Sequence, residues 1–402
     1  MFEKLFEPIQ IGNVTVPNRI AMAPMVTAYS DRGYVSEQQL AYYAARAKGG
    51  VGLIVTEHIL ASEWAKKNCP LNVMGLYNPS QVQGLAELVD TIHAFGARTF
   101  IQMNPGLGAQ GYSILSGEQP VGPSAVSYRT NPETVPKNIP FDVYMIGEPP
   151  REMTVDEIEQ EQDNFAQAAL FAHIAGFDGL EIHSAHGFLL HDFLSPRFNQ
   201  RTDEYGGNLE NRCRFLVELI RKIRDYVGRE MVIGVRASAH EPDGITYADM
   251  KDIVHRLAQE EIDYFHLGDG TFEALGWLLP STDGTMLELE KQTGFKKDLG
   301  IPVITPSIHD PKSAEDAIVN GQTDMVSLAR ALLADPEWAN KVKDGRVSDI
   351  TKCIRCNKGC FGRLFAGLTV NCVLNPETGI ERYNPEYSRW SLINNKRQTG
   401  VA

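Results

Sequence analysis

The 402-residue sequence predicts an α/β protein whose main part is a (β/α)8 barrel, also called a TIM barrel. Short runs rich in β-branched and apolar residues alternate with helix-like stretches, and eight such runs can be counted along the chain. Strands that alternate with helices pair in parallel through right-handed crossovers, which give either a closed barrel or an open doubly wound sheet. Eight units favour the closed barrel, and the open sheet is the alternative.

Local signals support each element of this alternation. Ser36 followed by Gln39, and Thr154 followed by Glu157, have the form of capping boxes at helix starts. Gly96 stands where a helix is expected to end, at a position that favours left-handed backbone. The expected strands cover residues 19–23, 52–56, 98–102, 179–183, 232–236, 264–267, 302–305 and 325–328.

One long segment, residues 104–153, interrupts the alternation. It is rich in Gly, Pro, Ser and Tyr and shows little helical pattern. Loops of this length inside a compact domain are usually lids or binding loops. The segment follows the third expected strand, so it should lie on the catalytic face of the barrel. Its tyrosines Tyr112, Tyr128 and Tyr144 favour packing over a disordered insertion.

The charge and the apolar pattern exclude several classes of partner. A formal net charge of −13 argues against nucleic acid, because phosphate binding needs a basic face. No apolar run reaches the roughly 20 residues that a bilayer span needs, and the N-terminus lacks the features of a signal peptide. We therefore expect a soluble, cytoplasmic protein that binds neither nucleic acid nor membrane.

Polar residues stand at the ends of the expected strands, where a barrel holds its catalytic groups. A hydrogen-bonding set of this kind suits a planar heterocycle with a phosphate tail, because Gln102 can both donate and accept at a ring edge and Arg236 supplies positive charge. Ser307 and Ala329-Arg330 follow the last two strands, where barrels commonly hold phosphate. The full set is Pro24, Met25, Val26, Glu57, His58, Gln102, His183, His186, Arg236, Ser307, Ala329 and Arg330.

Three motifs resemble those of the old yellow enzyme family. They are RIAMAPMVT from Arg19, HSAHGFLLHDFLSPRFNQRTDEYGGNLENRCRF from His183, and TPSIHDPKSAEDAIVNGQTDMVSLARALLADP from Thr305. The resemblance extends to about Pro376 and implies that the chain binds FMN. By this resemblance the FMN ligands are Pro24, Met25, Val26, Gln102, Arg236, Ser307, Ala329 and Arg330, with His58 near the ring.

His183 and His186 are the expected catalytic pair. By the resemblance, both donate hydrogen bonds to a carbonyl or nitro oxygen that lies over the flavin, which makes an alkene a better hydride acceptor. A zinc site is the rival interpretation, but two histidines are only half of one. Many family members have a proton-donating tyrosine where this chain has Phe188. The acid would then be His191, a tyrosine of the long loop, or water, or the reaction needs none.

Four cysteines form a cluster near the C-terminus. Cys353, Cys356, Cys360 and Cys372 have the spacing C-x2-C-x3-C-x11-C, which suits either zinc or a [4Fe–4S] cluster. This run is similar to the cluster segments of 2,4-dienoyl-CoA reductases, 2-enoate reductases and trimethylamine dehydrogenase, which implies [4Fe–4S]. We expect residues 1–350 to form the FMN-binding barrel, and residues 351–402 the iron–sulfur segment and tail.

The resemblance implies an ene-reductase that transfers hydride from FMN to the β-carbon of an α,β-unsaturated carbonyl compound. The alternatives are an amine or N-methyl dehydrogenase of the trimethylamine dehydrogenase type and an electron-transfer subunit without its own substrate. No G-x-G-x-x-G run is present to bind a dinucleotide. Either the electron source is a separate protein or the chain is a fragment of a longer enzyme. We expect a separate electron donor, namely a reductase subunit, a ferredoxin or a flavodoxin, with direct use of a nicotinamide cofactor at the FMN as the alternative, and the chain could also form a homo-oligomer.

Overall fold

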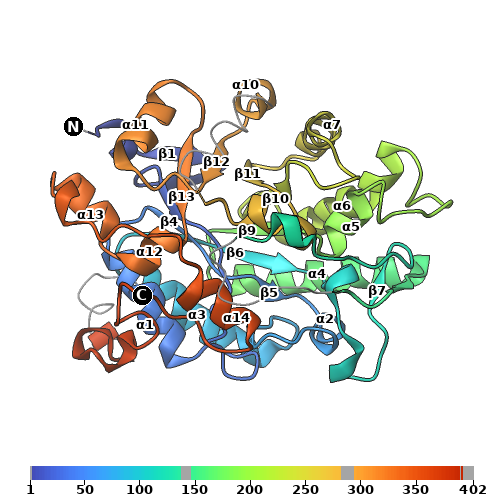
Figure 1. Ribbon diagram of the computed structural model, residues 1–402, viewed down its shortest axis with the longest axis horizontal. Coiled ribbons are helices and arrows are strands. Elements are labelled where there is room, and N and C mark those ends of the chain that lie inside the picture. Colours follow the sequence, from blue (N-terminus) through green and yellow to red (C-terminus); the bar gives the residue numbers. More distant parts are fainter. Residues whose placement is uncertain (1, 137–145, 282–293, 390, 393–402) are drawn as a thin grey trace.

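A closed ring of eight parallel strands forms the centre of the protein (Figure 1). The computed structural model describes residues 2–136, 146–281, 294–389 and 391–392. The last strand of the ring pairs with the first, so the sheet is a barrel and the open doubly wound alternative is wrong. In order, the strands are β3 (Ile20–Met22), β4 (Leu53–Val55), β6 (Arg98–Asn104), β9 (Gly179–Ser184), β10 (Val232–Ser238), β11 (Tyr264–Gly268), β12 (Val303–Pro306) and β13 (Met325–Leu328).

These strands lie where the sequence predicts them. The largest differences are at the ends of β6 and β10, each of which continues two residues beyond the predicted end. Both predicted capping boxes are present, with Ser36 accepting from the backbone of Gln39 and Thr154 from that of Glu157. Gly96 has a φ of 83°, as expected for a left-handed residue after a helix.

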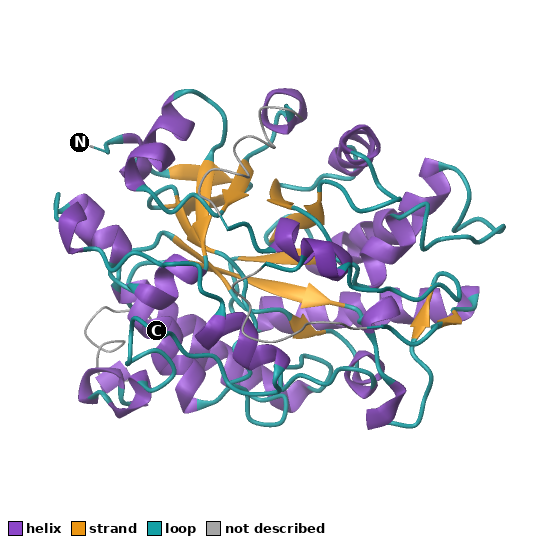
Figure 2. Ribbon diagram, in the orientation of Figure 1, coloured by secondary structure: helices purple, strands orange, loops and turns teal. Residues whose placement is uncertain are grey.

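Helices surround the strands, and each buries one face against them (Figure 2). In α6, for example, the buried residues Cys213, Leu216, Ile220 and Ile223 recur at the three- and four-residue spacing of one helix face. The helices of the outer layer are α1 (Glu37–Lys48), α3 (Val82–His93), α4 (Val155–Ile174), α6 (Leu209–Val227), α7 (Tyr247–Ala258), α10 (Phe295–Leu299), α11 (Pro311–Val319), α12 (Arg330–Ala334) and α13 (Trp338–Lys343). Shorter helices in the connecting segments are α2 (Glu63–Lys67), α5 (Leu189–Leu194), α8 (Leu275–Leu278) and α14 (Arg363–Phe365). Among the described residues, no helix combines the length and apolar character that crossing a bilayer would require.

An N-terminal hairpin closes one end of the barrel. Its strands β1 (Ile9–Ile11) and β2 (Val14–Val16) are antiparallel. Their buried side chains pack with residues that come from the starts and middles of barrel strands, including Leu53, Phe100 and Val232. Because this end is filled by apolar side chains, only the carboxyl-terminal end of the strands is available for a polar site.

The long segment after β6 is packed against the carboxyl-terminal end of the barrel. Within this segment, the short strand β7 (Val121–Gly122) pairs with β8 (Arg151–Glu152). The Tyr112 and Tyr128 hydroxyls lie 2.9 Å apart, and the Tyr128 side chain is buried. The third predicted packing residue, Tyr144, lies outside the described residues.

The cysteine-containing segment packs on the barrel and shares its apolar core through Val370 and Leu392. The Tyr29 hydroxyl donates to the Val370 carbonyl at 2.6 Å, and Thr378 donates to the Leu333 carbonyl at 2.7 Å. A buried ion pair joins Arg46 of α1 to Glu381. These contacts join the cysteine-containing segment to the barrel. The predicted division at residue 350 stays a prediction.

The apolar filling at the closed end makes a prediction about stability. Phe100→Ala should lower the free energy of unfolding by about 3–5 kcal/mol, because the ring is completely buried and its removal leaves a cavity. Ile174→Ala, at the exposed end of α4, should change it by less than about 0.5 kcal/mol. Urea titration of both variants measures the difference, and equal effects would contradict this account of the core.

Candidate functional site

Two connected cavities open at the carboxyl-terminal end of the barrel. We call the one above the strands, of about 210 Å³, the inner cavity, and the one of about 360 Å³ beneath the long loop the outer cavity. Both are lined by His58, Leu71, Phe188, Phe272, Phe361 and Leu364. The two cavities therefore share part of their walls.

The inner cavity gathers most of the residues that were predicted to hold FMN. Of the nine, eight line it, namely Pro24, Met25, Val26, His58, Arg236, Ser307, Ala329 and Arg330. The ninth, Gln102, is buried in the barrel and donates to Glu181 at 2.7 Å. His186 also lines the cavity, and the His183 ring lies 5.7 Å from that of His186 and 5.6 Å from that of His58.

Arg236 gives the inner cavity its positive charge. The residue is buried, and no carboxylate of the described residues lies within ion-pair distance of its guanidinium. Its nearest polar partner is the His266 ring, whose Nε2 lies 3.1 Å from Arg236 Nη1. A buried cation that has no anionic partner is costly, so this position suits an electron-rich ring or an anion. The donor set thus fits the flavin that the sequence predicts.

Backbone strain marks two of the predicted residues. Ser307 and His186 each have a φ of 65°, in the left-handed region that residues other than glycine rarely adopt. Such residues cost about 1–3 kcal/mol each and persist where the surrounding structure holds them. Here the Ser307 N–H donates to the Ser327 carbonyl at 3.1 Å, and the His186 N–H donates to Ser238 Oγ at 2.9 Å. Both residues are therefore held rigidly at the rim of the cavity.

Glu57 fixes the loop that carries Pro24, Met25 and Val26. The backbone N–H and the hydroxyl of Thr27 each donate to the Glu57 carboxylate at 2.9 Å, and Gln39 donates to it at 2.7 Å. Complete burial raises the pKa of Glu57 above its ordinary value. The strand-end position of Glu57 is visible in the sequence, whereas its function as a support for the loop is not.

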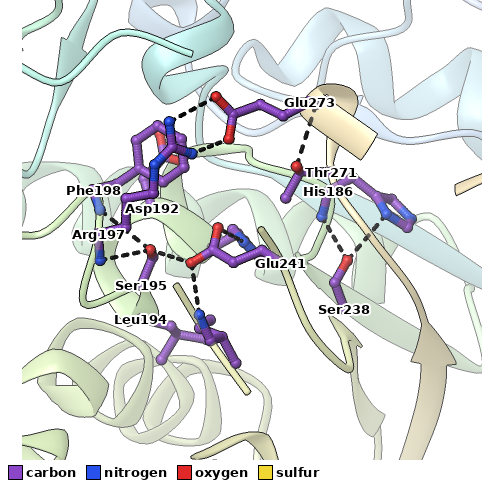
Figure 3. A network of polar contacts seen from close by, with 12 residues as sticks. His186, Asp192, Leu194, Ser195, Arg197, Phe198, Ser238, Glu241, Thr271 and Glu273 are labelled. Atoms are coloured by element: carbon purple, nitrogen blue, oxygen red, sulfur yellow. Dashed lines mark hydrogen bonds and ion pairs between the residues drawn. The ribbon is translucent and has the colours of Figure 1, made fainter. Parts of the chain in front are cut away.

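The two histidines of the pair differ in their hydrogen bonding. The Ser238 hydroxyl donates to the Gly270 carbonyl at 2.7 Å, so His186 Nδ1, at 3.1 Å from Ser238 Oγ and 3.2 Å from the Gly270 carbonyl, must carry the proton (Figure 3). Burial lowers the pKa of His186 well below its ordinary value, so the ring is neutral and its Nε2 is an acceptor.

His183 is free to donate. Its Nδ1 is buried and has no hydrogen-bond partner among the described residues. Burial and the neighbouring His58 lower the pKa of His183 well below the ordinary range, so this ring is neutral as well. In this state the pair offers one N–H donor from His183 and one acceptor from His186 Nε2, whereas two donors were predicted.

The placement of His191 and Phe188 concerns the proton donor, because Phe188 stands where many family members have a proton-donating tyrosine. His191 is fully buried, its Nε2 lies 3.0 Å from a Glu241 oxygen, and Ser195 bonds to the same carboxylate. Like His183, it lines neither cavity, and its function as a proton donor stays a prediction. The Phe188 ring lies 4.8 Å from that of His183 and closes the space where family members carry tyrosine.

The outer cavity is apolar and aromatic. Among the residues that the structure describes, none of the side chains that line it is an Asp, Glu, Lys or Arg. The Phe272 ring lies 5.9 Å from Phe188 and 5.8 Å from Phe365, which itself stacks near Phe361 at 4.2 Å. Phe361 and Phe365 belong to the cysteine-containing segment, and Tyr112 and Tyr128 of the long loop form the opposite wall.

The four cysteines line one small cavity of about 20 Å³. Arg330 of the inner cavity lines it too, and the Arg355 N–H donates to Cys353 Sγ at 3.3 Å. Burial raises the pKa of Cys360 to about 11. As placed, no three metal-binding side chains in the described part of the chain are close enough to hold an ion. Four thiols around one cavity have the chemistry that an iron–sulfur cluster requires, and the metal-ligand assignment of Cys353, Cys356, Cys360 and Cys372 stays a prediction.

A polar network inside the barrel was not predicted. Glu181 of β9 accepts from Gln102 at 2.7 Å, from the Tyr264 hydroxyl at 3.0 Å and from His266 Nδ1 at 2.7 Å. Ser327 Oγ lies 2.9 Å from His266 Nε2. The sequence signal for this network is a carboxylate and a histidine within otherwise apolar strands. Such groups are rarely buried without polar partners.

Comparison with known proteins places this geometry in a family. The NADH:flavin oxidoreductase / NADH oxidase family matches residues 4–349. A NADH oxidase of Thermoanaerobacter brockii is 39% identical over 94% of this chain and 57% of its own, and a cinnamate reductase of Clostridium sporogenes is 32% identical over 95% and 59%.

Solved structures agree. A 2-naphthoyl-CoA reductase in complex with 2-naphthoyl-CoA has a TM-score of 0.86 at 32% identity, covering 96% of this chain and 59% of its own. For histamine dehydrogenase of Rhizobium sp. 4-9 the TM-score is 0.83 at 29% identity, with 94% and 53% covered. The chain spans a little over half the length of these relatives. It belongs to the NADH:flavin oxidoreductase / NADH oxidase family, a family of flavin-dependent oxidoreductases, as its resemblance to the old yellow enzymes predicts.

Proposed function

We propose that this chain is an FMN-dependent ene-reductase that acts on an activated C=C bond, such as that of an α,β-unsaturated carbonyl compound. The observation that carries the proposal is His183, whose neutral ring has an unpartnered, buried Nδ1 and lies 5.6 Å from the ring of His58 and 5.7 Å from that of His186, both of which line the cavity that suits a flavin. A buried N–H that lacks a protein partner is positioned to bind a substrate oxygen.

The residues of the inner cavity would hold FMN through Arg236 at the ring, and through Ser307, Ala329 and Arg330 at the phosphate. When bound, FMN supplies the hydride that the β-carbon of the substrate receives, and the α-carbon takes its proton from water or from a tyrosine of the long loop, Tyr112 or Tyr128, since Phe188 has no hydroxyl. His183 donates a hydrogen bond to the carbonyl oxygen and stabilises the negative charge that develops there. The phenylalanines of the outer cavity exclude water and receive the apolar part of the substrate.

The outer cavity also indicates which substrates fit. Because none of the described side chains that line it is an Asp, Glu, Lys or Arg, a free carboxylate on the substrate would be buried among them without a partner, at a considerable cost. Ketones, esters, thioesters and amides that carry a planar aromatic group therefore suit it best. A cavity of this kind also distinguishes the chain from an electron-transfer subunit, which needs no substrate site.

A second candidate is oxidation of an amine. It is favoured by His186 Nε2, which is an acceptor in the neutral ring and can take an amine proton, and by Phe188, since this reaction requires no acid directed at carbon. Aromatic faces in the outer cavity could also bind a cationic amine. Histamine dehydrogenase is one of the structurally similar proteins.

We further propose that the four cysteines hold a [4Fe–4S] cluster that receives electrons from a separate donor protein. Four thiols line one cavity, and Arg330 borders both this cavity and the inner one. An iron–sulfur cluster transfers single electrons, which suits a donor such as a ferredoxin, a flavodoxin or a reductase subunit.

Reoxidation of the reduced flavin tests the direction of the reaction. Anaerobically reduced protein should be reoxidised by an aryl enone such as benzylideneacetone, whereas amines should not reduce the oxidised form. His183→Ala should slow the reoxidation about 100-fold or more, as removal of one oxyanion donor does elsewhere. His255→Ala on α7, outside both cavities, should have no effect. Reduction of the flavin by an amine, with no response to any enone, would favour the second candidate.

Iron analysis tests the cluster. Cys356→Ser should remove most of the iron and the associated visible absorbance after anaerobic reconstitution, because it deletes one of four thiolates. The matched control is Cys213→Ala, which removes a buried thiol of α6 outside the four and should retain the iron. Zinc in place of iron in the wild type, or full iron in Cys356→Ser, would contradict the assignment.

Neutral histidines in the site make stability depend on pH. Burial lowers the pKa of His58 to about 4, whereas an unfolded histidine titrates near about 6.5. The unfolded chain therefore binds the proton first, so the stability that neutral His58 contributes is present above about pH 6.5 and lost as the pH falls toward about 4. Between about pH 7.5 and about pH 5, the wild type should lose about 2 kcal/mol more unfolding free energy than His58→Gln. Urea titrations at both pH values measure this, and equal losses would show that His58 is not held neutral.

A further inference from the structure

We propose that Glu181 is the positioning residue for the flavin ring, and that its negative charge, transmitted through His266 to Arg236, lowers the midpoint potential of bound FMN. The inference rests on the proposed binding of FMN in the inner cavity. It concerns buried side chains of β6, β9 and β11 that line neither cavity, together with Arg236 of β10, which lines the inner one.

The first arm of the network sets the orientation of Gln102. Its Nε2 donates to Glu181 Oε1 at 2.7 Å. An amide has one donor end and one acceptor end, so this bond directs the Gln102 carbonyl oxygen away from Glu181. The second N–H of the amide remains available, so this bond fixes which end of the amide faces Glu181 and leaves Gln102 able both to accept and to donate. With an apolar residue at position 181, the amide would be free to rotate and present either end.

The second arm fixes Arg236. Glu181 Oε2 lies 2.7 Å from His266 Nδ1, and Arg236 Nη1 lies 3.1 Å from His266 Nε2. Arg236 Nη1 also lies 3.4 Å from His266 Nδ1, so the guanidinium lies against the ring and not along one lone pair. A carboxylate can only accept, so the single ring proton lies on Nδ1, where it is donated to Glu181, and Nε2 accepts from the Ser327 hydroxyl at 2.9 Å. His266 is therefore a neutral spacer, in agreement with the burial that lowers its pKa. It holds the guanidinium in place without bringing the carboxylate into direct contact with it.

Glu181 remains charged in this setting. Burial alone raises the pKa of its carboxyl, but the surrounding donors and the Arg236 charge bring that pKa below its ordinary value. One negative and one positive charge, both buried, thus lie on opposite sides of a neutral ring. Flavin reduction adds negative charge next to Arg236, and a carboxylate behind the arginine opposes it. Glu181 should accordingly make the flavin harder to reduce than Arg236 alone would.

Two substitutions distinguish charge from packing because they predict shifts of opposite sign. Glu181→Gln keeps the shape and removes the negative charge, so the midpoint potential of the flavin should rise. Tyr264→Phe removes one hydroxyl that donates to Glu181 Oε2 and leaves the carboxylate less neutralised, so the potential should fall slightly. Glu218→Gln removes a carboxylate of α6 outside the barrel, where Tyr205 and Gln162 donate to it, and should leave the potential unchanged.

The potentials are measured on FMN-loaded protein by anaerobic reductive titration against an indicator dye, following the flavin absorbance. The dissociation constant for FMN is measured in parallel by fluorescence, and Glu181→Asp, which keeps the charge but shortens the reach to Gln102, should weaken FMN binding more than it shifts the potential. The proposal is overturned if Glu181→Gln has the midpoint potential of the wild type. It is also overturned if Glu181→Gln and Tyr264→Phe shift the midpoint potential in the same direction. If Glu181→Gln does not fold, the proposal is overturned by a midpoint potential in Tyr264→Phe that equals or exceeds that of the wild type. Failure of the wild type to bind FMN, or to react with any enone, would instead count against the proposed function.

Discussion

Closure of the barrel is the constraint on which the rest of the structure depends. The pairing of β13 with β3 makes all eight strands end at one rim. Residues as far apart in the sequence as Met25 and Arg330 thereby line the same cavity. The hairpin of β1 and β2 fills the opposite end with apolar side chains. A polar site can therefore form only at the carboxyl-terminal end of the barrel strands. An open sheet would separate Arg330 from Met25 and leave no common site.

The rim also joins the two proposed redox sites. Cys360 is followed directly by Phe361, which lines both the inner and the outer cavity, while Arg330 borders both the inner cavity and the cysteine cavity. A change in the conformation of the cysteine segment must therefore alter the wall of the substrate site. If the cysteines hold a cluster and the outer cavity binds substrate, as proposed, these shared side chains couple the two sites.

Much of this could be predicted because the signals are local. Runs of four or five residues identified the strands, Ser36 and Thr154 marked helix starts, and strand-end positions identified residues such as His58 and Ser307. Features that depend on three-dimensional partners could not be predicted. The tautomer of His186 is set by Ser238 and Gly270, and the burial of His191 is set by Glu241, about fifty residues away in the chain. The network of Glu181 joins four strands, so nothing near Glu181 in the sequence identifies its partners.

The central claim is that the inner cavity is the flavin site and that the residues at the carboxyl ends of the barrel strands hold the cofactor. A crystal structure of the anaerobically purified protein reconstituted with FMN tests it most directly. The account predicts the flavin ring between His58 and Arg236, with its phosphate at Ser307 and Arg330. Flavin density elsewhere on the molecule, or an inner cavity that stays empty at saturating FMN, would contradict it.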